Sequence, residues 1–256
     1  MPVTTFNEFL ARISAGYEHI VPVWGEAATA TVVLGSNSIA IKRIGWASST
    51  PASFPNGVSA FIPSEVYASR SITDGTLLFA WLINFGDLNI AGPTFTDGSA
   101  MPTVMEGNIS RQLDSAALME VITPLSSDPG SITVTYVDQD GNTETTAAQT
   151  LGASAPVRSS GFILLNAPDR GVRDITNATR TGGTTPTGVI RFWGIVPIAF
   201  MGISPTNVGG VAYQNLITES FNYLRLGTDA TLGVFSFGST ATEAVIGAIK
   251  IVGDSS

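Results

Sequence analysis

Apolar residues near the amino terminus recur at helical spacing. They are Phe6, Phe9, Leu10, Ile13 and Tyr17. Thr5 and Glu8 have the spacing of a capping box, and Gly16 is suited to end a helix. The pattern therefore predicts one short amphipathic helix, from about residue 5 to residue 15, with an unusually aromatic face. Such a helix can dock on its own domain or act as an arm that docks on a neighbouring subunit.

Beyond residue 20 the pattern changes to that of β-strands, rich in Val, Ile, Thr and aromatic residues and bounded by Gly, Pro, Asn and Asp. The predicted strands are 38–46, 76–85, 118–124, 132–137, 143–151, 161–166, 172–179 and 188–200. Residues 131–137 alternate between apolar and polar, as in a half-buried antiparallel strand. Residues 77–83 are continuously apolar, so we expect both faces of that strand to be covered. The segments 47–57, 89–108 and 179–187 are predicted to be loops.

The carboxyl-terminal part gives mixed signals. Residues 213–226 have partly helical spacing, residues 231–237 have a strand pattern, and residues 244–252 fit either structure. The strands do not alternate with helical patterns, which argues against a Rossmann or TIM-barrel fold. We therefore predict a mainly β protein, an antiparallel β-sandwich or jelly roll with a short N-terminal helix. Its expected parts are an arm (1–20), a β-rich body (21–204) and a C-terminal extension (205–256) packed on the body or on a neighbour.

Composition changes this picture, because the chain is short of charge. Only 12% of its 256 residues are charged, whereas 44% are hydrophobic, and the mean hydropathy is +0.28. An ordinary soluble domain has roughly 25% charged residues. With this little charge, much of the surface of a monomer would be poorly solvated. We therefore expect neighbouring subunits to cover a large part of it. The composition predicts a building block of an assembly, and in particular a homo-oligomer.

The sign of the charge excludes some partners. The net charge is −8, the only lysines are Lys42 and Lys250, and the arginines are scattered singly. No basic patch stands out, so neither nucleic acid nor an anionic membrane is an expected partner. The chain has no cysteine, so its fold uses no disulfide or thiolate metal site and can assemble in a reducing cytoplasm. We expect no cofactor.

Four oxygen-bearing residues fall at alternate positions, as in the first half of a calcium loop. They are Asp138, Asp140, Asn142 and Glu144. The match then fails, because Thr143 stands where glycine is needed and Gln149 where an acid is needed. Asp140 and Gly141 between two strand patterns are typical of a hairpin turn. The sequence therefore predicts a hairpin, in which these four residues are the candidates for a cation site.

Catalytic motifs are missing from the sequence. There is one histidine, His19, and there is no G-x-S-x-G motif and no P-loop. The acidic residues are spread over turns and single out no carboxylate pair suited to glycoside hydrolysis. We therefore predict that the chain is not an enzyme. Trp81 and Trp193 lie within apolar runs and are expected in the core, whereas Trp24 and Trp46 are suited to stack on a sugar. That possibility keeps a carbohydrate-binding β-sandwich open as an alternative.

Several segments occur in an order that resembles structural proteins of tailed bacteriophage virions, in which a Val-Thr-Tyr…Gln-Asp-Gly hairpin recurs. They are 117–125, 129–130, 132–142, 171–175 and 189–197, with further likeness at 9–16 and 20–24. The resemblance implies a virion subunit that decorates or cements the capsid. It also implies assembly in the host cytoplasm, the major capsid protein or other virion proteins as partners, and a trimer at a local symmetry axis. A tail, collar or fibre-base subunit is the alternative within the same class.

A protein of this kind functions through its surfaces. The aromatic helix and the charged segment 169–174 are the places where we expect contacts between subunits. The predicted interface residues are Phe6, Phe9 and Ile13 on the helix, and Arg170 and Arg173 in the charged segment.

Overall fold

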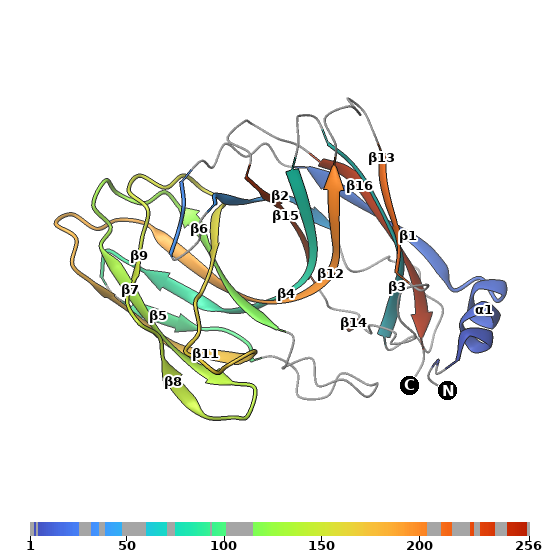
Figure 1. Cartoon of the computed structure of the whole chain (residues 1–256), viewed down its shortest axis with the longest axis horizontal. Helices are drawn as coiled ribbons and strands as arrows, with labels where there is room; N and C mark the ends of the chain where they lie inside the picture. The colour runs from blue at the N-terminus through green and yellow to red at the C-terminus, as the bar shows by residue number, and fades with distance from the viewer. Residues whose placement is uncertain are drawn as a thin grey trace.

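The computed structural model contains one helix and sixteen strands, and it describes residues 3, 5–25, 32–35, 39–47, 60–70, 75–92, 94–100, 115–203, 211–216, 226–227, 231–238 and 245–254 (Figure 1). The first elements are α1 (Phe6–Ser14), β1 (Glu18–Gly25), β2 (Ile41–Ala47), β3 (Ala60–Arg70), β4 (Gly75–Asn89) and β5 (Thr94–Asp97). The middle elements are β6 (Ala116–Thr123), β7 (Ser131–Asp138), β8 (Thr143–Thr145), β9 (Gln149–Thr150), β10 (Ser159–Phe162) and β11 (Val172–Thr181). The last are β12 (Val189–Ile203), β13 (Val211–Asn215), β14 (Leu226–Gly227), β15 (Thr231–Phe237) and β16 (Val245–Asp254).

The helix begins where its capping box predicts. The Thr5 side chain accepts a hydrogen bond from the Glu8 backbone N–H (3.3 Å), and the Glu8 carboxylate accepts one from the Thr5 N–H (2.9 Å). These bonds satisfy two donors that a helix start otherwise leaves without partners. The predicted helix is confirmed. It packs on its own chain, because Phe9 is buried against Ile62 and Val252.

Twelve strands form one antiparallel sheet that partly closes on itself. Its order is β10-β6-β12-β4-β15-β2-β1-β16-β3-β13, with β5 also paired to β4 and β14 to β3, and β10 also pairs with β2. The strands from β10 to β2 therefore form a closed, barrel-like ring of six. Beyond β2 the same sheet continues as β1, β16, β3 and β13, which lie together at the helix end of the molecule (Figure 1).

A second, four-stranded sheet has the order β11-β7-β8, with β9 also paired to β7. Strand β7 alternates buried and half-buried residues, as its sequence predicts. Its buried residues, which include Ile132 and Val134, join the same apolar cluster as Phe85 and Leu88 of β4. The prediction of a mainly β, antiparallel protein with a short N-terminal helix is confirmed.

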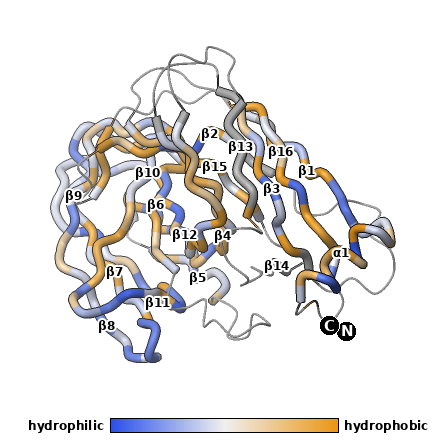
Figure 2. Tube along the Cα trace, turned by 45° about the vertical axis from the view of Figure 1, so that its right-hand side comes forward, coloured by the Kyte–Doolittle hydropathy of each residue, from blue (hydrophilic) through white to orange (hydrophobic). Residues whose placement is uncertain are grey.

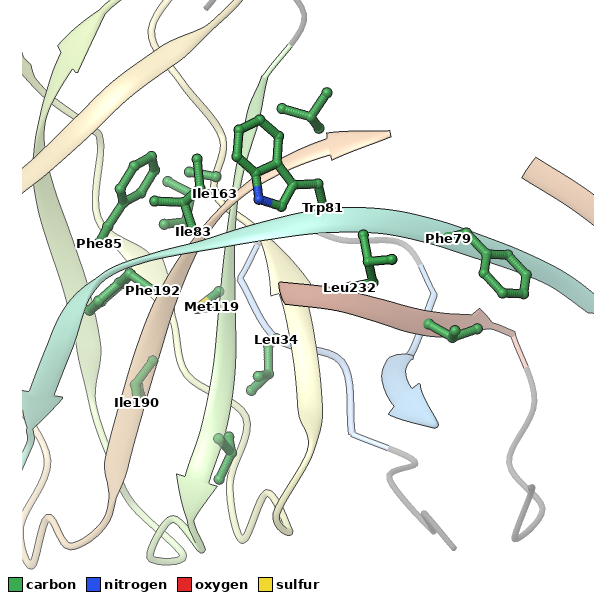
Figure 3. Close-up of a cluster of buried hydrophobic side chains, with 14 of the residues drawn as sticks. Leu34, Phe79, Trp81, Ile83, Phe85, Met119, Ile163, Ile190, Phe192 and Leu232 are labelled. Carbon is green, nitrogen blue, oxygen red and sulfur yellow. The ribbon is translucent and has the colours of Figure 1, made fainter. Parts of the chain in front are cut away.

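Both faces of β4 are buried, as the continuous apolar run predicts. One face contributes to the larger cluster through Leu77, Phe79, Trp81 and Ile83, part of which is drawn in Figure 3. The other face contributes to a smaller cluster through Leu78, Ala80 and Leu82. Trp81 and Trp193 are buried in these two clusters, which confirms their expected place in the core.

The structure corrects several local predictions. Strands β1 and β3 were not predicted, and β5 lies within the segment 89–108 that was expected to be a loop. The predicted strand 161–166 corresponds to β10, which ends at Phe162. Residues 245–252 of the ambiguous segment 244–252 are strand, and residue 244 lies outside the described part. Residues 211–215 are strand although 213–226 had partly helical spacing; residues 217–225 also lie outside the described part. His19 lies in β1, opposite Ile251.

A buried ion pair connects three strands of the ring. The Glu120 carboxylate on β6 is fully buried and accepts hydrogen bonds from Arg43 Nε on β2 (2.7 Å) and from Trp193 Nε1 on β12 (2.7 Å). A second pair, in which Arg191 binds Asp87 in a bidentate manner, is about one third exposed. Two pairs of the same chemistry thus differ in burial.

We expect Glu120→Ala to lower the free energy of unfolding by about 3–5 kcal/mol, because it removes the buried carboxylate that Arg43 and Trp193 bind. Asp87→Ala is the matched control, and its expected cost is about 1 kcal/mol or less. Urea unfolding of both variants and of the parent measures the difference. Equal costs would show that the burial of the Glu120 pair has no energetic consequence.

Candidate functional site

Exposed apolar residues gather on one face of the sheet formed by β1, β16 and β3. Alternation along each strand separates this face from the core. Val21 and Val23 of β1 and Ile249 and Ile251 of β16 belong to the larger core cluster. The residues between them point the other way. This outer face comprises Ile20 and Pro22 of β1, Glu65 and Tyr67 of β3, and Ile246, Ala248 and Lys250 of β16.

Among the described elements, a helix covers one end of the outer face. Helix α1 lies over that end, where Phe9 packs on Val252 and Ile62 (Figures 1 and 2). Beyond the helix, Ile20, which is opposite Lys250, is 68% exposed, and Ile246, farther along β16 and opposite Trp24, is 76% exposed. We call this uncovered part the bare end and define it by Ile20, Pro22 and Ile246. A contiguous exposed apolar patch on a soluble protein typically marks a contact surface.

The charges on the outer face are paired with one another. Lys250 Nζ lies 3.0 Å from Glu18 Oε1 and 3.6 Å from Glu65 Oε2, and the Tyr67 hydroxyl donates a hydrogen bond to Glu65. The hydrogen bond to Glu18, assisted by the negative charges of both carboxylates, raises the pKa of Lys250 in spite of desolvation. The two acidic side chains of this region therefore have local partners.

The predicted interface residues of the helix divide between core and surface. Phe9 is 3% exposed and belongs to the cluster under the helix, and Ile13 packs against that cluster. Phe6 stacks on Phe9 with the ring centroids 6.4 Å apart, yet it is 46% exposed, and Leu10 is 43% exposed. The helix thus keeps an apolar flank, Phe6 and Leu10, that its own sheet does not bury.

The other predicted interface residues, Arg170 and Arg173, lie beside the β7–β8 hairpin. Arg173 Nη2 donates to the Gln139 backbone oxygen (2.6 Å), and the backbone N–H groups of Arg170 and Gly171 donate to the Gln139 side chain. The segment that contains both arginines is therefore held to the hairpin by hydrogen bonds within the chain.

The hairpin itself is confirmed, and Asp138 organises its turn. Asp138 Oδ1 accepts hydrogen bonds from the backbone N–H groups of Asp140 and Asn142, both at 2.8 Å, and Oδ2 accepts one from Asn142 Nδ2. Gly141 adopts a φ of +91°, which suits glycine in this kind of turn. Desolvation alone would raise the pKa of Asp138, but the hydrogen bonds from Asn142, Asp140 and Gly141 outweigh it and lower that pKa.

The structure brings together only two of the four predicted cation ligands. Oxygens of Asp138, Glu144 and Asp169 lie within 4.8 Å of one another, so these three residues are the ones suited to hold a cation. Asp140 is not part of this group, and Asn142 acts as a hydrogen-bond donor to Asp138. The sequence pattern missed Asp169, because it lies on a later segment that meets the hairpin only in the folded chain.

Protein donors already bind each of these carboxylates. Asn166 Nδ2 donates to Glu144 (2.9 Å), and the buried Tyr136 hydroxyl donates to Asp169. Burial, together with the hydrogen bond to Asp169, raises the pKa of Tyr136. A cation would have to compete with these donors. The same hydrogen bonds hold the hairpin against the segment 163–170.

The tryptophans suggested for sugar stacking lie on paired strands. The backbones of Trp24 on β1 and Trp46 on β2 are direct partners in the sheet. Their side chains lie outside the described part of the structure, so stacking on a sugar stays a prediction. No helix in the described ranges is both long and apolar enough to cross a membrane.

Comparison with known proteins gives no family. No family model matches the chain, and no curated protein matches it. Among solved structures, the chain is similar to the VP2 subviral particle of infectious bursal disease virus, at 10% identity and a TM-score of 0.21 over 93% of this chain and 81% of that chain. Particles derived from the same virus with T=1 symmetry give 12% identity and a TM-score of 0.18 over 93% of this chain and 77% of that chain. Scores in this range do not show a shared fold.

The lowered pKa of Asp138 predicts a specific acid sensitivity. A carboxyl group whose pKa is lower in the folded state stabilises the protein above its unfolded pKa of about 3.9, and this contribution is lost as the pH falls through the folded value. We therefore expect Asp138→Asn to lose less stability than the parent between about pH 5 and pH 3. Asp140→Asn, which removes the same charge from the same turn, is the control. Thermal unfolding across this range would contradict the account if all three proteins showed the same slope.

Proposed function

We propose that this chain is a structural subunit of a virus particle, and more specifically a capsid decoration protein of a bacteriophage that stabilises the shell through contacts between subunits. The observation that carries the proposal is the exposed apolar surface of the outer face, with Ile20 and Ile246 on the bare end and the apolar flank of α1 at the covered end. Side chains of this kind are expected at the centre of a protein interface.

The composition supports the same function. Only 12% of the residues are charged, and the charges near the bare end are paired within the chain. A protein that works inside an assembly needs little charge on the surfaces that its neighbours cover. The resemblance of the hairpin and strand segments to tailed bacteriophage virion proteins supports the finer assignment to a capsid.

The hydrogen-bonded polar groups described above have structural roles. Glu120 holds three strands of the ring together, and Asp138 holds the hairpin turn. The proposed function therefore lies in surfaces and not in a catalytic site. The expected partners are further copies of this chain and the major capsid protein, and the net charge of −8 disfavours direct contact with nucleic acid.

The mechanism would be mass action. A subunit that binds the assembled shell, and not its separated components, lowers the free energy of the assembled state by an amount that grows with subunit concentration and affinity. Such a subunit needs a rigid body and a preformed contact face. The antiparallel sheet supplies the body, and the outer face supplies the contact.

The test is whether the chain is a stoichiometric part of purified particles. We expect quantitative mass spectrometry of purified virus particles, prepared from the virus whose genome encodes this chain, to find the chain at a fixed ratio to the main shell protein. Particles stripped of the chain should open at a lower temperature, and adding the purified chain should restore the original temperature. If the chain is absent from the particles, the proposed function is wrong; if it is present only in the tail, the assignment to decoration is wrong.

A further inference from the structure

We propose that the outer face pairs with the outer face of a second copy of this chain around a two-fold axis. In this pairing the apolar flank of α1 in each copy packs on the bare end of the other copy. The proposal rests on the proposed function, because it names the partner that covers the same face. It also goes further, because it specifies a dimer contact and its geometry.

The shape of the outer face is suited to pairing with itself. Helix α1 lies over one end (Figure 1), and toward the other end Ile246 is 76% exposed. Residues 245–250 of β16, which run through the uncovered part, extend over about 20 Å. The nine residues of α1 are about 13 Å long, so the helix of a second copy fits within this length.

A two-fold axis satisfies both ends at once. Rotation by 180° about an axis that lies in the interface, parallel to the sheet and across its strands, turns the two outer faces toward each other. It brings the raised end of one copy over the bare end of the other, and the reverse contact follows by symmetry. An isologous contact of this kind requires a self-complementary surface, in which a raised end and a recessed end lie side by side. The single outer face of this chain contains both.

The charge distribution favours a second copy at this face. Two copies with a net charge of −8 each repel one another over most of their surfaces. On the outer face, however, Lys250 lies between Glu18 and Glu65, and Tyr67 donates to Glu65. Because these carboxylates already have partners, two outer faces can meet with little repulsion between like charges.

The apolar side chains supply the favourable free energy. Ile246 and Ile20 are the two most exposed large hydrophobic residues of the described chain, at 76% and 68%. Phe6 and Leu10 add a second exposed apolar group on the helix. When the helix flank of one copy packs on the bare end of the other, both sets of apolar side chains leave water, and the two-fold axis repeats this contact on the other side of the dimer.

Two single variants test the contact. Ile246→Glu places a charge on the bare end, and Leu10→Lys places one on the helix flank. Both residues are exposed, so the fold should tolerate the changes, which thermal unfolding can check. We expect each variant to weaken the dimer at least about tenfold in sedimentation velocity, because every dimer then buries two unpaired charges. Leu164→Glu, at a residue that is 62% exposed and lies beyond β10, is the matched control and should dimerise like the parent.

Mixing the two variants gives the decisive measurement. In a mixed dimer, one contact places the native Leu10 on the native Ile246, and the other places the introduced Lys against the introduced Glu. We therefore expect an equimolar mixture to recover dimers that neither variant forms alone. This recovery is specific to a two-fold contact between the helix and the bare end.

The proposal would be overturned by a parent protein that stays monomeric up to high concentration, by an oligomer that the two variants leave unchanged, or by a mixture that stays monomeric. A trimer that both variants disrupt would place the same face in a cyclic contact and would also exclude the two-fold. None of these results bears on the presence of the chain in particles, which mass spectrometry measures separately. A failure of this inference can thus be told apart from a failure of the proposed function.

Discussion

Strand β2 has three neighbours, and the arrangement of the large sheet depends on this. Along one edge it pairs with β15. Along the other edge, Ile41 and Lys42 pair with β10 and thereby close the ring of six strands, whereas Gly45, Trp46 and Ala47 pair with β1. Backbone hydrogen-bonding groups along a strand edge need partners, and dividing the edge between two strands satisfies them while allowing the sheet to continue beyond the ring.

This division produces the outer face. Because β1 starts a new run of strands at β2, the sheet of β1, β16 and β3 has one face directed to the core and one directed away from it. The end of β1 lies close to the start of β16: a Cβ atom on Gly25, which pairs with Gly45 of β2, would lie 2.3 Å from the Val245 backbone oxygen. The short helix α1 covers only part of the outward face. The outer face is thus a consequence of the way in which the sheet is extended.

The sequence predicts the features that depend on neighbouring residues. The capping box of α1, the hairpin turn at Asp140 and Gly141, and the burial of both faces of residues 77–83 all follow from local spacing. Strand β1 was missed partly because it contains Pro22, which disfavours a strand assignment; β2 reaches only residues 23–25 of β1, so Pro22 lies where proline is tolerated. Pro63 of β3 lies similarly beside a register shift.

Features that join distant segments could not be predicted. The closure of the ring through β10 and β2, and the meeting of Asp169 with Asp138 and Glu144, depend on the path of the whole chain. The sparse charge directs attention to surfaces as the place to look for function. It could not indicate which surface, because the outer face is formed from strands at opposite ends of the sequence.

The central claim is that a partner covers the bare end in the working state. Hydroxyl-radical footprinting with mass spectrometry, at low and high protein concentration, tests it most directly. The account predicts that labelling of Ile20 and Ile246 falls as concentration rises, while labelling of Leu164 stays constant. If the labelling of Ile20 and Ile246 does not change with concentration, and the protein remains monomeric, the account is contradicted.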